Sequence, residues 1–359
     1  MKKLTLLGCL LMIAGGLAAV RLHGEAPAPG TGGGAIPWPA GLPVYDHVVI
    51  VVEENKDYAQ IIDEPGRRTS KAPYINLTLR REGANLTRMF GEEHNSQGNY
   101  FWLFSGSNQG VGFRDGIPDV PIQAPNLGTA LIGSGRSFKG YCEDLPEIGS
   151  TEFFWPVGAK HDKRRYARKH APCVSFTNVP NGNSVATSSN LRFLDFPTCP
   201  ANFDTLPTVA IVVPNLTNDM HNGSAEQSIP TGDTWLKEHL NGYYQWAKTH
   251  NSLLIVTWDE NDDQAGPDHD AKVLGLTNPF VEPTDQRARN MQNRIPTIIA
   301  GAHVRPGDYE EGNGVNHVNI LRTLEAMYGL PRSAAQQPFA SAGGIRDDYT
   351  ITDIFEKVK

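Results

Sequence analysis

Acidic and amide side chains follow three apolar runs of the chain at the point where each run ends. Glu54 and Asn55 follow the first run, and Asp219 comes shortly after the second. Asp259 and Glu260 follow the third. Each acidic residue alone is compatible with a solvated turn, but carboxylates crowded into one crevice need a cation or a shared proton. Oxygen ligands suit Mg, Mn, Ca or Zn, so the run ends predict a site for one or two divalent ions.

A serine stands where a loop gives way to a predicted helix. The segment from His94 to Tyr100 reads His-Asn-Ser-Gln-Gly-Asn-Tyr and leads into an aromatic run that ends at Phe104. Ser96 then lies at the helix N-terminus, where unpaired N–H groups and the helix dipole favour anions. A helix cap is the simpler interpretation. The alternative is a metal-activated nucleophile that attacks phosphorus, with the helix-end amides and Asn99 holding the phosphoryl oxygens.

Two of the eleven histidines occupy positions that suit catalysis. His221 follows a predicted strand and His317 opens a predicted helix, so both are candidate site residues. His94 is a weaker third candidate, for substrate binding. His170 and His303 are interpreted as structural residues.

The elements that position these residues follow from hydrophobic patterning. Four short apolar runs rich in β-branched residues predict strands, at 47–52, 208–213, 253–258 and 295–300. Because the runs are continuous rather than alternating, we expect parallel strands covered on both faces. Residues 174–176 are a candidate fifth strand. Helical spacing predicts helices over 234–250 and 318–328, the second ending at Gly329. This alternation indicates an α/β fold with a mostly parallel central sheet.

Length and charge limit the class of protein. The chain has 359 residues, enough for one large α/β domain. With 32 Lys and Arg against 39 Asp and Glu, the formal net charge is −7, so we expect no nucleic-acid partner.

The N-terminal segment predicts export. Two lysines precede the apolar residues 4–20, an order typical of a secretory signal peptide, and residues 1–24 are assigned to a signal peptide or N-terminal anchor. We expect a secreted, periplasmic or cell-surface protein, with membrane contact only through this segment if it is not cleaved. Residues 25–43 are Gly/Pro/Ala-rich and predict a flexible linker. The compact domain spans 44–359, and 267–292 is interpreted as a surface insertion and candidate lid.

Four cysteines raise the question of lipidation and disulfides. Cys9 lies in a lipobox-like Leu-Leu-Gly-Cys, but the apolar run continues past it, which disfavours a lipid anchor. Cys142, Cys173 and Cys199 remain in the exported part. One disulfide and one free thiol are expected, and the sequence does not choose the pair.

Taken together, these segments resemble the bacterial and fungal phosphoesterases grouped with acid phosphatases and phosphatidylcholine-type phospholipase C, within the alkaline phosphatase superfamily. The resemblance runs from Asp46 to Phe355. It is carried by five blocks in the family's order, at 47–55, 94–107, 213–221, 258–260 and 316–323. It implies an alkaline-phosphatase-like three-layer sandwich, with helices on both faces of a mostly parallel central sheet.

The resemblance also implies a role for each candidate residue. It makes metal ligands of four residues named above: Glu54, Asn55, Asp259 and Glu260. Ser96 becomes the nucleophile that is phosphorylated and also touches metal. Asp219, His221 and His317 match positions that bind a second metal in two-metal relatives. In one-metal relatives the two histidines contact phosphate or protonate the leaving group.

Three positions depart from the family pattern. Gly98 stands where proline is expected, Asn222 where aspartate follows the histidine, and Val318 where an aromatic residue is common. We interpret the first as a change in loop stiffness. The second is expected to weaken a carboxylate contact behind a second metal.

We therefore expect an exported metal-dependent phosphoesterase, foremost a phosphomonoesterase of the acid phosphatase type acting through phosphoserine. The expected cofactor is Zn, Mg, Mn or Ca, and the expected substrate is a small phosphate ester or a phospholipid. The nearest alternative is a phospholipase C or other phosphodiesterase, with the aromatic run 100–104 and the insertion 267–292 accepting lipid. A non-catalytic metal-binding surface protein with a closed coordination shell is the alternative from another class.

Overall fold

The computed structural model describes residues 37–67, 69–111, 114–262, 293–310, 314–333 and 349–357. The predicted signal segment 1–24, most of the linker and the predicted insertion 267–292 lie outside the described residues. Residues 38–359 form one compact unit. No helix among the described residues has the length and apolar character needed to span a bilayer.

The helices and strands of this unit are mostly short. The α-helices are α1 (Tyr58–Ile61), α2 (Arg80–Glu82), α3 (Ser96–Ser105), α4 (Leu127–Gly133), α5 (Ala225–Ala247) and α8 (His317–Tyr328). One π-helix, η1 (Ile75–Leu79), precedes α2. The 3₁₀ helices are η2 (His161–Lys163), η3 (Arg168–His170), η4 (Pro172–Ser175), η5 (Phe193–Asp195) and η6 (Pro200–Thr205). The strands are β1 (His47–Glu53), β2 (Ala84–Leu86), β3 (Met89–Phe90), β4 (Phe138–Cys142), β5 (Phe154–Trp155), β6 (Tyr166–Ala167), β7 (Asn190–Arg192), β8 (Val209–Val213), β9 (Ser252–Trp258), β10 (Thr297–Gly301), β11 (Gly307–Tyr309) and β12 (Val315–Asn316).

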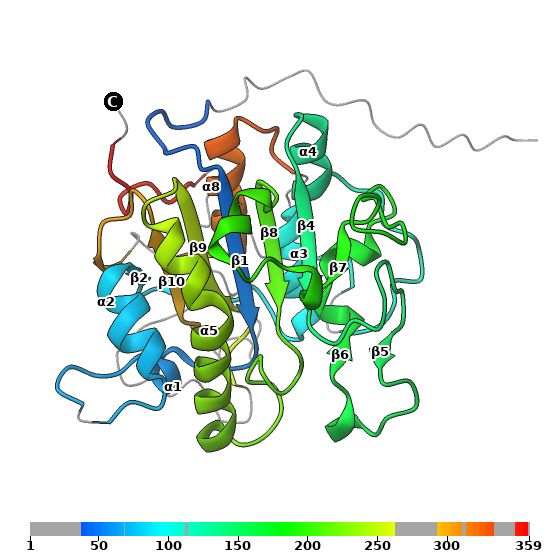
Figure 1. Ribbon diagram of the computed structural model, residues 1–359, viewed down its shortest axis with the longest axis horizontal. Helices are drawn as coiled ribbons and strands as arrows, with labels where there is room; N and C mark the ends of the chain where they lie inside the picture. The colour runs from blue at the N-terminus through cyan, green and yellow to red at the C-terminus, as the bar shows by residue number, and fades with distance from the viewer. Residues whose placement is uncertain are drawn as a thin grey trace, which may run out of the picture. The chain divides into compact units, whose positions relative to one another are not determined.

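Eight of these strands form the central sheet, in the order β11-β2-β10-β9-β1-β8-β4-β7. Neighbours from β9 to β7 are parallel, whereas β10 is antiparallel to both β9 and β2 (Figure 1). Since β1 lies between β8 and β9, the carboxyl ends of these three strands meet at one edge of the sheet, where ligands bind in such folds.

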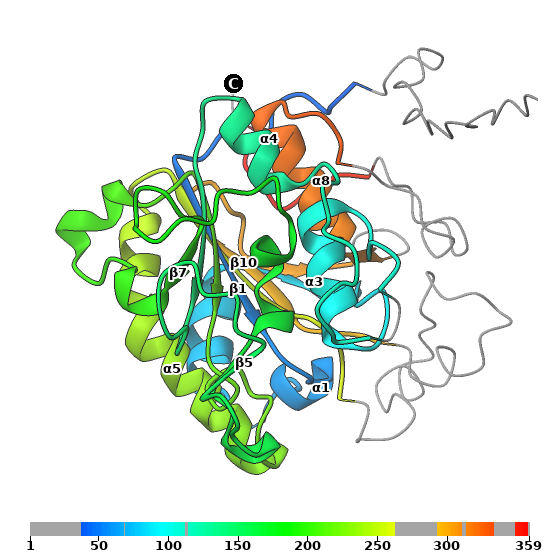
Figure 2. The same cartoon turned by 90° about the vertical axis from the view of Figure 1, so that its right-hand side faces the viewer.

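The sheet has helices on both faces. Helix α5 covers one face, and α3, α4 and α8 lie on the other (Figures 1 and 2). The three strands that lead to the site are buried along almost their whole length, which is why their sequences are continuously apolar. The mostly parallel α/β arrangement expected from the sequence is confirmed.

Two predictions about strands were wrong. The run 295–300 forms a buried strand, β10, but this strand is antiparallel. A continuous apolar run reports burial on both faces and carries no information about direction. Residues 174–176 do not form a strand of the sheet. They end η4, and Phe176 makes only an isolated bridge to Ile122.

Both predicted helices form, with different bounds. Helix α8 begins at His317, where Asn316 caps it by accepting a hydrogen bond from the Asn319 amide, and it ends at Gly329 with φ 62°. Helix α5 begins at Ala225, nine residues before the predicted start at Thr234. Pro230 is the sixth residue of this helix, so the i→i−4 hydrogen bond to the Glu226 carbonyl is missing there.

The predicted disulfide is wrong for the three cysteines described. Cys142, Cys173 and Cys199 are all free, the first two buried and the third exposed. Burial raises the pKa of Cys142 well above its ordinary range and that of Cys173 to about 12. Both thiols therefore stay protonated and serve as small core side chains.

Candidate active site

Backbone hydrogen bonds hold the three strand ends together. The Glu54 amide donates to the Asp219 carbonyl at 2.7 Å, and the Asp259 amide donates to the Glu53 carbonyl at 3.0 Å. The Asn55 amide donates to Asp259 Oδ1 at 3.2 Å. The candidate ligands predicted from separate runs therefore stand on one rigid edge of the sheet.

Ser96 lies within reach of this edge. It is the first residue of α3, with Asn95 as the N-cap. Its Oγ is 3.0 Å from Glu54 Oε2 and 3.4 Å from Glu260 Oε1. Lys169 Nζ donates to the same oxygen at 3.2 Å. A buried serine hydroxyl thus sits between two carboxylates and an ammonium group, at a helix N-terminus that favours anions.

Negative charge is concentrated at this point. Burial, reinforced by the charge of Glu54, raises the pKa of Asp219 and of Asp259 well above the ordinary range. Burial also raises the pKa of Glu260, against the opposing contact with His94. The buried carboxylates repel one another, so positive charge brought among them stabilises the site.

His170 contacts two of these carboxylates, although the sequence analysis interpreted it as structural. Its Nε2 lies 3.0 Å from Glu54 Oε1 and its Nδ1 lies 3.6 Å from Asp219 Oδ2. Tyr100 stacks on the imidazole and donates to Glu54 Oε1 at 2.9 Å. Burial raises the pKa of Glu54, but His170 and a neighbouring lysine outweigh it and hold that pKa well below its usual value. That interpretation of His170 is corrected: it belongs to the site.

Lys169 is a second residue that the sequence analysis missed. Its Nζ lies 3.0 Å from Asp115 Oδ2, while Asp115 Oδ1 accepts from the Gln97 amide at 3.1 Å. Burial lowers the pKa of Lys169, but Glu54 and Asp115 outweigh burial and raise it above its ordinary value. The ammonium beside Ser96 is therefore charged, and Asp115 fixes its position against the first turn of α3.

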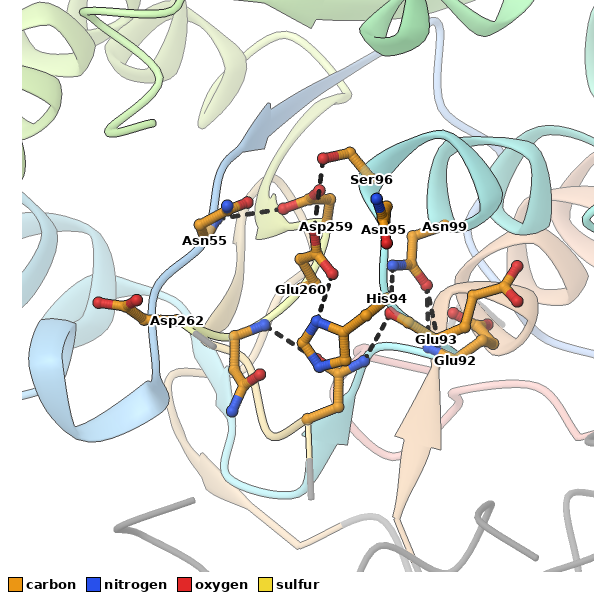
Figure 3. A network of polar contacts seen from close by, with 12 residues as sticks. Asn55, Glu92, Glu93, His94, Asn95, Ser96, Asn99, Asp259, Glu260 and Asp262 are labelled. Carbon is orange, nitrogen blue, oxygen red and sulfur yellow. Dashed lines mark hydrogen bonds and ion pairs between the residues drawn. The ribbon is translucent and has the colours of Figure 1, made fainter. Parts of the chain in front are cut away.

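The oxygen atoms of the site fit a divalent cation. Asn55 Oδ1, Asp219 Oδ2 and Asp259 Oδ2 are buried and have no hydrogen-bond partner. Such acceptors are the ligands that hard divalent ions prefer. In Figure 3, Asn55 and Asp259 turn toward each other beside Glu260. Among the described residues, no three His, Cys, Asp or Glu side chains already form a ligand set, and Glu54 and Glu260 each direct one oxygen to a histidine.

Two of the predicted histidines lie in the site. His94 Nδ1 is 2.5 Å from Glu260 Oε2. His221 donates its backbone N–H to Asp219 Oδ1 at 2.8 Å, and its ring Nδ1 is 3.1 Å from Asn222 Oδ1. Burial lowers the pKa of His221 to about 4. Asn222, the departure from the family's aspartate, thus contacts this imidazole directly.

His317 and Asn99 are placed differently from the prediction. His317 Nδ1 is 2.5 Å from Glu92 Oε2, and its Nε2 is 2.8 Å from the Trp258 carbonyl. Asn99 Oδ1 accepts from the Glu92 and Glu93 amides, and Asn99 Nδ2 donates to the Glu93 carbonyl (Figure 3). These side chains position the end of β9 and the loop before α3. The contacts of both residues with phosphate stay predictions.

Gly98 is explained by packing rather than by loop stiffness. It lies inside α3, and a Cβ added there would meet Glu93 Oε1 at 2.0 Å. The Glu93 carboxylate accepts from Trp102 Nε1 at 3.2 Å and from Asn108 Nδ2 at 3.1 Å. Burial, with a contribution from Glu92, raises the pKa of Glu93 to about 7. The absent side chain of Gly98 makes room for this buried carboxyl group.

The aromatic run that follows Ser96 belongs to the core. Tyr100 to Phe104 are each at most 1% exposed. They cannot accept the organic group of a substrate, so the idea that this run binds lipid was wrong. Helix α3 packs between α8 and the segment around η3 and η4, which covers its aromatic side chains.

A pocket of about 160 Å³ lies beside Lys169, the residue that donates to Ser96 Oγ. Its lining includes Asp115, Lys169 and His221 together with Phe153 and Phe154. Charged groups near Ser96 thus adjoin aromatic side chains. This arrangement suits a phosphate carrying an organic group.

The chain is similar to known proteins in sequence. The model of the phosphoesterase family matches residues 67–331. A phosphatidylinositol-3-phosphatase of Mycobacterium tuberculosis is 42% identical over 294 residues, which cover 82% of this chain and 80% of that protein. A phosphate-repressible acid phosphatase of Penicillium chrysogenum is 26% identical over 293 residues, 80% of this chain and 60% of that protein.

Solved structures share the fold. The lipoteichoic acid synthase LtaP from Listeria monocytogenes matches with a TM-score of 0.53 at 12% identity, covering 84% of this chain and 76% of that chain. A protein of the alkaline phosphatase superfamily from Vibrio parahaemolyticus matches with a TM-score of 0.52 at 12% identity, covering 81% and 69%. At this identity the likeness concerns the fold alone.

Proposed function

The chain belongs to the phosphoesterase family and is a hydrolase of phosphate ester bonds, and from this premise we propose a metal-dependent phosphomonoesterase that acts through phosphoserine at Ser96. The proposal includes export, on the evidence of the signal-like residues 1–24. The cofactor would be one or two ions of Mg, Mn, Ca or Zn.

The contact set of Ser96 carries the proposal. Its hydroxyl has Glu54 and Glu260 as hydrogen-bond acceptors and Lys169 as a donor. An acceptor draws the proton away from Oγ, and a cation stabilises the negative charge that develops there, which together activate a serine nucleophile.

The chain's own residues divide the remaining work. In the proposed reaction a bond forms between Ser96 Oγ and phosphorus as the bond to the alcohol breaks, and water then releases phosphate from the serine. Lys169 and the first amides of α3 hold phosphoryl oxygens. His221 lines the pocket beside Lys169, where its ring is placed to contact the leaving oxygen.

A bound divalent ion would supply charge neutralisation and a Lewis acid among the carboxylates. Glu54, Asn55, Asp259 and Glu260 would hold it, with Asp219 available to a second ion. The buried oxygens without hydrogen-bond partners support this assignment.

Hydrolysis of monoesters is favoured over that of diesters. The relatives are named as an inositol-lipid 3-phosphatase and an acid phosphatase, names that denote monoesters. The argument for phospholipase C relied on the aromatic run 100–104, which is core, and on the insertion 267–292, which lies outside the described residues. Membership of an enzyme family argues against a non-catalytic metal-binding surface protein.

Two experiments test the proposal: substitution of Ser96, and trapping of the phosphorylated serine during turnover. Ser96→Ala is expected to lower kcat on p-nitrophenyl phosphate about a thousandfold or more. Ser134→Ala, at an exposed serine beyond α4, serves as the matched control. Acid quenching during turnover, followed by mass spectrometry, should find phosphate on the peptide that contains Ser96. Near-normal turnover by Ser96→Ala, or phosphate trapped on another residue, would contradict the proposal.

A further inference from the structure

Strands β5 and β6 form a small antiparallel sheet separate from the central one. In Figure 1 this hairpin lies at the same end of the molecule as the carboxyl ends of β1 and β8. It is therefore a projection on the side of the molecule where the proposed nucleophile lies.

The hairpin exposes large apolar side chains. Phe153 is 40% exposed, Trp155 39% and Val157 62%. Three such residues within five positions are unusual on a surface turned only toward water. Trp and Phe are the side chains that settle at the boundary between lipid headgroups and acyl chains.

The hairpin and the short helix η3 that follows it are rich in basic residues, in a chain whose formal net charge is −7. Between positions 160 and 169 there are six Lys or Arg residues and one acidic residue, Asp162: Lys160, Lys163, Arg164, Arg165, Arg168 and Lys169. Lys160 and Lys163 are exposed. The Arg164 guanidinium stacks 3.8 Å above the Phe154 ring, so cationic and aromatic groups form one surface.

This surface is continuous with the pocket. Phe153, Phe154 and Arg164 of the hairpin line it, and so does Lys169, whose ammonium contacts Ser96. An anionic group bound at the hairpin is therefore next to the pocket beside the nucleophile.

We propose that the β5–β6 hairpin docks the enzyme on an anionic lipid surface, with its aromatic and apolar side chains in the interface and its lysines on the headgroups. The substrate class is then phosphate monoesters carried by lipid headgroups. The hydrolytic half of this inference rests on the proposed function. A lipid surface is favoured over a nucleic acid or an acidic protein because exposed Trp155 and Val157 stand beside the basic side chains, and a bilayer interface accommodates both kinds of group.

The test uses the full-length protein and flotation with vesicles. Vesicles of phosphatidylcholine alone are compared with vesicles that also contain phosphatidylserine. The wild type is expected to float with the anionic vesicles only. Lys160→Gln combined with Lys163→Gln should weaken this binding about tenfold or more. The matched control, Lys237→Gln with Lys248→Gln near the C-terminal part of α5, should bind as the wild type does.

The aromatic contribution is tested separately. Trp155→Ala should weaken vesicle binding, whereas Trp155→Phe should preserve most of it. The lysine and Trp155 variants should hydrolyse p-nitrophenyl phosphate at the wild-type rate, because none of these side chains lines the pocket. Their rate on a lipid phosphate monoester presented in vesicles should fall with binding.

The two proposals fail in different ways. If p-nitrophenyl phosphate is hydrolysed but anionic vesicles are not bound, or are bound equally well by the hairpin variants, the docking inference is wrong. Equal binding to neutral vesicles, or equal competition by duplex DNA, would overturn it as well. If vesicle binding depends on the hairpin but no phosphate ester is hydrolysed under any divalent ion, docking holds and the proposed function fails.

Discussion

Replacing Lys169 by methionine tests the proposed activation of Ser96. The substitution keeps the length of the side chain and removes an ammonium group that donates to Ser96 Oγ. It also removes a positive charge that helps to keep Glu54 ionised. We therefore expect the substitution to lower kcat more than it raises KM.

The size of the effect follows from the contact distance. At the observed 3.2 Å, two full charges in an effective dielectric of about 20 attract by about 5 kcal/mol. Part of that attraction is already present in the ground state, where Lys169 donates a hydrogen bond to the neutral Ser96 hydroxyl. A loss of about 3–4 kcal/mol, or two to three orders of magnitude in kcat, is therefore expected, as for removal of one preorganised donor to a developing oxyanion.

The assay is steady-state hydrolysis of p-nitrophenyl phosphate, with kcat and KM measured separately. A fall in kcat that clearly exceeds the rise in KM is expected, because the charge on the serine oxygen develops in the transition state. Lys163→Met, at an exposed lysine of the same hairpin, is the control and should leave both constants unchanged. A Lys169→Met enzyme within a few-fold of the wild type would refute the argument.

Two further predictions concern metal and pH. Chelation should abolish hydrolysis and lower the melting temperature, because it leaves the carboxylates of Asp219, Asp259 and Glu260 to repel one another. Adding back a divalent ion should restore both the activity and the melting temperature. An unchanged melting temperature after chelation would contradict this prediction. The pKa of Glu93 is raised to about 7 from 4.5 in the folded protein. Below pH 4.5 the carboxyl group is protonated in both the folded and the unfolded state, so it does not change the free energy of unfolding. As the pH rises from 4.5 to about 7, the group ionises more readily in the unfolded chain, so the free energy of unfolding of the wild type falls. In urea unfolding, the free energy of unfolding of Glu93→Gln should therefore rise relative to that of the wild type by up to about 3 kcal/mol between pH 5 and pH 8. A difference between the two proteins that does not change with pH would refute the assignment.

The parts of the site that the sequence predicts are those governed by local rules. Val and Ile in continuous runs indicate buried strands, and parallel strands present their carboxyl ends together, which brings Glu54, Asp259 and Glu260 to one edge. Ser96 was placed at a helix start by the loop-like residues before it and the aromatic run after it. For these residues, type and order along the chain were enough to predict proximity.

Site residues on irregular segments could not be predicted from the same sequence patterns. His170 and Lys169 lie on the short helix η3, and Asp115 lies on a loop, so neither a strand end nor a helical period marks them. The sequence also does not say which atoms a side chain contacts. Asn99 and His317 have the expected types near the expected places, but their polar atoms are used to hold backbone and Glu92.

The short strands β4 and β7 were not predicted from the sequence. Strand β4 contains Lys139 and Gly140, and β7 is three residues long, so neither shows the apolar run that identified β1, β8 and β9. Their positions in the sheet depend on pairing with β8 and with each other, which is a tertiary property.

The site joins two kinds of scaffold. The candidate metal ligands stand on strand ends joined by hydrogen bonds, while the cationic and aromatic groups stand on short helices and a small hairpin outside the central sheet. Exchanging residues 150–168 between homologous chains is therefore expected to change which phosphate ester is accepted and to leave the proposed catalytic residues in place. Substrate preference in such proteins can diverge quickly on an unchanged chemical core.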